Sequence, residues 1–185
     1  MSVRRHVPRI VLAAAAAASI ATSSIQWFID RSEPLPQLEL DDRAPTTMYA
    51  IQGILDTGED EPRSRGGEVQ VSIDLSARDT TSAQSATVEV ELRSVARDGE
   101  LDHQVFTVAP GGRVSGRLTL LAWQDCMARS CTEDFTLTVR RQPAQGGPTI
   151  EVSGTVYIDF SADGASEPPP GSGLILGITS LGPVP

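Results

Sequence analysis

The chain has 185 residues and a net charge of −9, and all 15 of its basic residues are arginine. This length fits one domain with extended ends, or at most two very small domains. The acidic balance, with no basic cluster after the first nine residues, argues against binding to nucleic acid, whose phosphates require Lys and Arg.

Residues 1–21 have the three-part plan of a secretory signal peptide. A segment with three arginines (residues 1–9) precedes an alanine-rich apolar run, which ends with the small residues Ser19 and Ala21 that a signal peptidase recognises. The alternative is an uncleaved membrane anchor, because residues 10–29 form a weakly polar run of about the length that spans a bilayer. We expect a cleaved signal peptide and an exported protein, attached to a membrane only if this leader is retained.

Residues 22–45 are predicted to be a linker or arm, because residues 30–45 contain three prolines and seven charged side chains. Residues 38–40 are a candidate for a short edge strand within this arm.

Residues 46–160 are predicted to form one all-β domain of about seven strands. The predicted strands cover residues 47–55, 69–75, 86–92, 101–108, two segments within 111–139, and 149–160. Apolar and polar residues alternate along them, which is typical of antiparallel strands with one buried and one solvated face. Two such sheets packed face to face make a β-sandwich. The architecture resembles immunoglobulin-like and fibronectin-like modules in general, but the Cys…Trp…Cys frame of antibody domains is missing, so no family is indicated.

The two cysteines, Cys126 and Cys131, flank a short loop between two predicted strands. Strands joined by so short a loop are expected to be antiparallel neighbours, which would bring both cysteines within reach of a disulfide. A structural disulfide is the preferred interpretation for an exported protein; a redox-active pair, a metal site and two free thiols are the alternatives. Leu121 and Trp123 point to the face opposite the apolar residues of their strand. Either a bulge or a second covered face accommodates them, or Trp123 is an exposed contact for a partner.

Residues 161–173 are a Pro/Gly/Ser-rich linker, expected to be flexible. The apolar segment that follows (residues 174–181) is too short to span a membrane. It is expected to dock on the domain as a last edge strand, or to add a strand to a partner's sheet. In the second case Leu174, Ile175 and Leu176 would contact the partner.

Catalytic motifs are absent from the sequence, and only one histidine, His103, lies outside the leader. We therefore expect no enzymatic activity and no cofactor. Acidic loops are a weak signal for calcium, with Asp56, Asp60 and Glu61 as candidate ligands, although the EF-hand spacing is missing.

These observations predict an exported, non-catalytic β-sandwich that acts as an interaction or structural module of the cell envelope, with a protein partner there. A loop-based calcium- or carbohydrate-binding module is the alternative. The lack of Lys and Asn, whose codons begin with two adenines, indicates a G+C-rich and bacterial genome.

Overall fold

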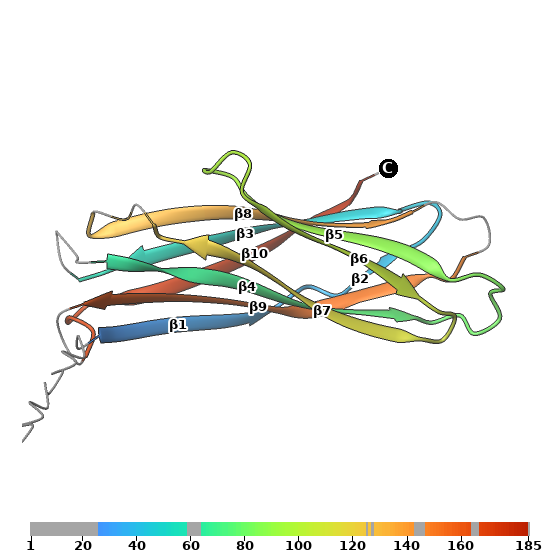
Figure 1. The fold of residues 1–185 in the computed structure, drawn as a ribbon, viewed down its shortest axis with the longest axis horizontal. Helices are drawn as coiled ribbons and strands as arrows, with labels where there is room; N and C mark the ends of the chain where they lie inside the picture. Colours follow the sequence, from blue (N-terminus) through green and yellow to red (C-terminus); the bar gives the residue numbers. More distant parts are fainter. Residues whose placement is uncertain are drawn as a thin grey trace, which may run out of the picture.

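The computed structural model describes residues 26–58, 64–124, 126, 128–142, 147–163 and 167–184. The predicted signal peptide lies outside these residues. The described residues form ten β-strands (Figure 1). The strands are β1 (Gln26–Pro34), β2 (Leu38–Leu40), β3 (Thr46–Asp56), β4 (Ser64–Ala77), β5 (Ala86–Ser94), β6 (Leu101–Val108), β7 (Arg113–Ala122), β8 (Ser130–Arg141), β9 (Ile150–Asp163) and β10 (Gly173–Val184).

The strands pack as two antiparallel sheets, which confirms the predicted β-sandwich. Sheet A has the order β1-β9-β4-β7, with β2 also pairing with β9, and sheet B has the order β10-β3-β8-β5-β6. The chain passes to the other sheet at every connection except β1–β2 and the β5–β6 hairpin. This interleaved order is that of a jelly roll with β10 as an additional edge strand, and it differs from the immunoglobulin order.

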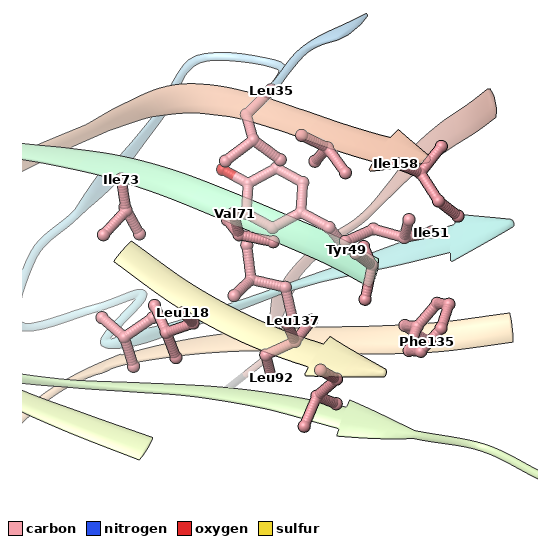
Figure 2. Close-up of a cluster of buried hydrophobic side chains, with 14 of the residues drawn as sticks. Leu35, Tyr49, Ile51, Val71, Ile73, Leu92, Leu118, Phe135, Leu137 and Ile158 are labelled. Atoms are coloured by element: carbon pink, nitrogen blue, oxygen red, sulfur yellow. The ribbon is translucent and has the colours of Figure 1, made fainter. Parts of the chain in front are cut away.

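The core lies between the sheets and consists mainly of branched aliphatic side chains (Figure 2). Sheet A contributes Val71, Ile73, Leu118 and Ile158, and sheet B contributes Tyr49, Ile51, Leu92, Phe135 and Leu137. The alternation read from the sequence places the correct face inward in each of these strands, because every second side chain points to the same side. The hydroxyl group of Tyr49, buried with its ring, donates to the carbonyl oxygen of Pro36 at 3.0 Å.

The segment expected to be a linker instead forms the edge of sheet A. Strand β1 pairs with β9 over nine residues, from Gln26 to Pro34, and β2 continues along the same strand. Trp27 is buried and its ring centroid lies 5.3 Å from that of Phe160. The prolines of this segment are typical of a linker, but an edge strand tolerates proline because one side of it needs no backbone donor.

The predicted hairpin between the cysteines is wrong. Strand β7 pairs with β4 in sheet A, whereas β8 pairs with β3 and β5 in sheet B. The chain leaves β7 at Trp123, whose φ of 61° lies in the left-handed region and ends the extended run. A short loop thus carries the chain from one sheet to the other, and proximity in sequence did not imply pairing.

Side chains cover the free edge of β7. The Gln104 amide on β6 donates to the carbonyl oxygen of Arg117 at 2.5 Å. The Asp102 carboxylate, also on β6, accepts from the N–H of Thr119 at 2.9 Å. An edge whose backbone groups are already bonded is a poor template for another strand, which limits edge-to-edge aggregation.

Gly53 on β3 is required by the close approach of the Trp123 ring. A Cβ at this position would lie 2.8 Å from Ile158 Cδ1 and 2.9 Å from Trp123 Cη2. We expect Gly53→Ala to lower the free energy of unfolding by roughly 1–3 kcal/mol, as overpacking of a core does, measured by urea denaturation. Gly177→Ala on the neighbouring strand is the matched control, because its Cβ would meet only Gln52 O at 3.9 Å. Equal effects of the two substitutions would contradict this account.

Candidate functional site

A hollow of about 510 Å³ opens on the outer face of sheet A, at the end where β7 finishes and β1 begins. We call it the sheet A hollow; it is lined by Phe28, Gly66, Gly67, Glu68, Leu121, Gln124, Asp159 and Ser161. These residues come from all four long strands of the sheet and from the start of the β7–β8 loop. Phe28 and Leu121 lie on its two edge strands and are 51% and 49% exposed.

Two consecutive glycines remove side chains from the floor of the hollow. Gly66 has a φ of 91°, which only glycine adopts readily. A Cβ on Gly67 would lie 1.9 Å from Asp159 O, so the backbones of β4 and β9 could not approach as they do. The register of the two strands shifts between Ser64 and Gly66. The glycine pair therefore shapes the hollow by the backbone conformation of β4 and by the close approach of β4 to β9.

Three carboxylates follow one row across the sheet beside this floor. Asp30 on β1 is the direct cross-strand partner of Asp159 on β9. The backbone N–H of Glu68 on β4 donates to Asp159 Oδ1 at 2.8 Å. We call Asp30, Asp159 and Glu68 the acidic row. Like charges on directly opposite residues are destabilising.

Burial raises the pKa of the Asp159 carboxyl above its usual range, and the nearby carboxylates of Glu68 and Asp30 raise it further. The hydrogen bonds from the Glu68 N–H and from Tyr157 act in the opposite direction. The hydroxyl of Tyr157 also donates to Asp30 Oδ2 at 3.3 Å. Burial and the two carboxylates raise the pKa of Tyr157 to about 12, so it remains a donor at neutral pH.

Trp123 is fully buried beneath the hollow, so the covered alternative holds for it and the alternative of an exposed partner contact is wrong. Its indole N–H donates to Asp159 O at 3.0 Å, and its backbone N–H donates to Glu133 Oε1 at 2.9 Å. Glu133 in turn pairs with Arg97, whose guanidinium also donates to the carbonyl oxygen of Leu121. Trp123 thereby holds the Asp159 backbone and the end of β7 in place.

Cys126 and Cys131 form a disulfide, with Cα atoms 5.9 Å apart. The bridge closes the loop that follows Trp123 and lies beside Glu133 and Arg97 at a second, smaller hollow. A disulfide is typical of an oxidising compartment. In the part of the chain that the structure describes, no helix is long and apolar enough to cross a bilayer.

The apolar segment near the C-terminus docks on its own domain as β10, the expected edge strand. It pairs with β3 from Gly173 to Val184, with an irregularity after Ser180. Leu176 is buried and Leu174 is half-buried against the core, whereas Ile175 points outward and is 63% exposed. Of the three candidate partner contacts, only Ile175 is freely accessible.

Of the three calcium candidates, only Asp56 lies among the described residues. Asp56 accepts from the N–H of Gly58 at 2.9 Å and from Arg129 Nε at 3.4 Å. Asp60 and Glu61 lie outside the described residues. Among the residues that are described, no group of three or more His, Cys, Asp or Glu side chains is placed to hold a metal ion.

No family model and no curated protein sequence matches this chain. Solved structures with a similar arrangement include dimeric latent PorU from Porphyromonas gingivalis (10% identity, TM-score 0.37), which covers 76% of this chain and 13% of that chain. The structure of infectious bursal disease virus, Gx strain, has 11% identity and a TM-score of 0.36, and the match covers 96% of this chain and 46% of that chain. The Drosophila NLP core has 13% identity and a TM-score of 0.28, and the match covers 72% of this chain and 98% of that chain. This chain thus spans a small part of PorU, and similarities of this size carry no argument about function.

The disulfide is expected to make a modest contribution to stability because it closes a very short loop. Replacing both Cys126 and Cys131 with alanine should lower the free energy of unfolding by about 2 kcal/mol on the loop-entropy model. Urea denaturation monitored by tryptophan fluorescence measures this difference. A double variant that does not fold at all would show that the bridge supports the whole sandwich and not only the Trp123 loop.

Asp159 should make stability fall as the pH rises. The folded state holds the Asp159 proton more tightly than the unfolded state, so it binds more protons between the usual carboxyl pKa and the raised one, and the free energy of unfolding decreases across that window. Asp159→Asn keeps the acceptor for the Glu68 N–H and removes the charge. We expect it to be more stable than the wild type above the window, with the gain vanishing below about pH 4, by urea denaturation. Asp74→Asn on the same sheet should give no gain, because it loses the 3.6 Å ion pair with Arg113.

Proposed function

We propose that this protein is an exported, non-catalytic interaction module of a bacterial cell envelope, and that the sheet A hollow is its partner-binding surface. The observation that carries the proposal is the uncovered pair of large apolar side chains, Phe28 and Leu121, on either side of a hollow in an otherwise polar sheet face. Exposed apolar side chains gathered in a depression with a polar rim are typical of binding surfaces.

Export is supported by the leader pattern of residues 1–21 together with the disulfide between Cys126 and Cys131. The two features are independent, since one lies in the sequence composition and the other in the folded domain. Both fit an oxidising compartment outside the cytoplasm.

A binding role fits the hollow better than catalysis does. Its carboxylates lie on an open sheet face, whereas electrostatic and acid–base catalysis depend on a site that excludes water. The loop-based calcium- or carbohydrate-binding alternative predicts a thermal shift on addition of millimolar calcium or of a glycan.

Site-specific photo-crosslinking in the native cells tests the proposal. A benzoylphenylalanine placed at Phe28 should give discrete higher-mass adducts, whereas the same group at Ile175, an even more exposed position on sheet B, should give few. Adducts only from Ile175 would move the binding surface to β10, and no adduct from either position would contradict an interaction module. The intact mass of the protein from the same cells should correspond to a chain that begins near Thr22; a full-length mass would contradict cleavage of the leader.

A further inference from the structure

The acidic row has no ion pair with a basic residue among the described residues, unlike several other carboxylates of sheet A. At the other end of the same sheet, Arg78 pairs with Glu39 at 2.5 Å and with Glu151 at 2.8 Å. Arginine is therefore available to compensate carboxylates on this sheet, and it also pairs with Glu33 and Asp74 there.

The acidic row also has a local energetic penalty, which is offset only by hydrogen bonds from uncharged donors, namely the Glu68 N–H, Tyr157 and Gln70. Asp30 and Asp159 are directly opposed, and Glu68 lies beside them on the next strand. Burial of Asp159 disfavours its charged form. Local features that lower stability are concentrated at functional sites.

The apolar and charged parts of the hollow are arranged for a cation that carries an aliphatic stem. Phe28 lies next to the row on β1, and Leu121 is the cross-strand partner of Glu68 on β7. Arginine and lysine side chains bury their methylene groups against apolar surface while the charged head meets a carboxylate, and an aromatic face attracts the guanidinium.

The open shape of the hollow indicates that the cation belongs to a larger partner and not to a small molecule. A site for a small molecule usually encloses most of the ligand surface, whereas this depression lies on an exposed sheet face between side chains that are about half exposed. A side chain held by a larger partner needs no such enclosure, because contacts around the hollow share the binding energy.

We propose that the sheet A hollow binds a basic segment of a partner protein, with an arginine or lysine side chain over the acidic row and its stem between Phe28 and Leu121. This inference rests on the proposed function, because it assigns a chemistry to the same surface. The net charge of −9 would steer such a partner toward the protein.

The test uses the chain without its leader and the peptide acetyl-Gly-Ser-Leu-Arg-Leu-Arg-Ser-Gly-amide, with citrulline in place of both arginines as the uncharged isostere. We expect binding by isothermal titration at low salt, at least tenfold weaker for the citrulline peptide and weaker at high salt. The NMR signal of the Trp123 indole N–H, which is bonded to Asp159 O directly beneath the hollow, should shift on binding.

Variants separate this site from a general attraction between opposite charges. Asp159→Asn and Phe28→Ser should each weaken binding about tenfold, and Asp74→Asn, which removes one charge from the same sheet outside the hollow, should change it less than twofold. Equal effects of Asp159→Asn and Asp74→Asn would overturn the proposal.

Other outcomes identify other occupants and also overturn it. Equal binding of the citrulline peptide would indicate a neutral ligand, and a response to glycans alone would indicate a carbohydrate site. Self-association that Phe28→Ser abolishes would indicate a second copy of this chain. If crosslinks form at Phe28 in cells while the arginine peptide does not bind, the proposed role as an interaction module is supported and the proposed basic partner is contradicted.

Discussion

The position of Trp123 between the two sheets is the constraint on which this end of the molecule depends. A bulky residue with a left-handed φ costs roughly 1–3 kcal/mol, and such a conformation persists only where the surroundings determine it. Here full burial against Gly53 and two hydrogen bonds, to Asp159 O and Glu133 Oε1, provide that determination. The same contacts direct the chain from sheet A to sheet B, so the crossover and the support of the hollow have one physical origin.

The hollow in turn depends on what the sheet omits. A regular sheet face has a side chain at every second position of each strand, whereas Gly66 and Gly67 contribute none to the floor of the hollow, where the Gln124 side chain lies close to Gly66. The close approach of β9 requires the second glycine, and the positive φ of the first is accompanied by the register shift in β4. Phe28 and Leu121 line this hollow and remain about half exposed.

The sequence predicted strands and their buried faces correctly wherever apolar and polar residues alternate within a single strand. Val69 to Leu75 and Ile150 to Phe160 alternate cleanly, and both were placed with the correct face inward. Pairing between strands was less accessible, because Cys126 and Cys131 are close in any arrangement and do not distinguish a hairpin from a crossover. The site was missed for a related reason: the leader pattern and the following prolines concealed β1 and Phe28, and the glycine pair resembled an ordinary loop. A glycine pair directly before an alternating strand was the one signal that could have indicated a hollow.

The electrostatics of the sheet follow from this geometry. Where β4 and β9 are regular, the outer face has room for arginine side chains across the strands, and Arg78 lies between Glu39 and Glu151. Where Gly66 and Gly67 contribute no side chain to the face, the acidic row faces solvent on one side. On its other side lies the Asp159 backbone, which the Trp123 indole N–H holds in place. Each contact with a cation there is partly exposed and hence individually modest. A partner recognised in this way gains specificity from the match of a charged head and an apolar stem to the hollow, and its association is sensitive to salt more than to buried area.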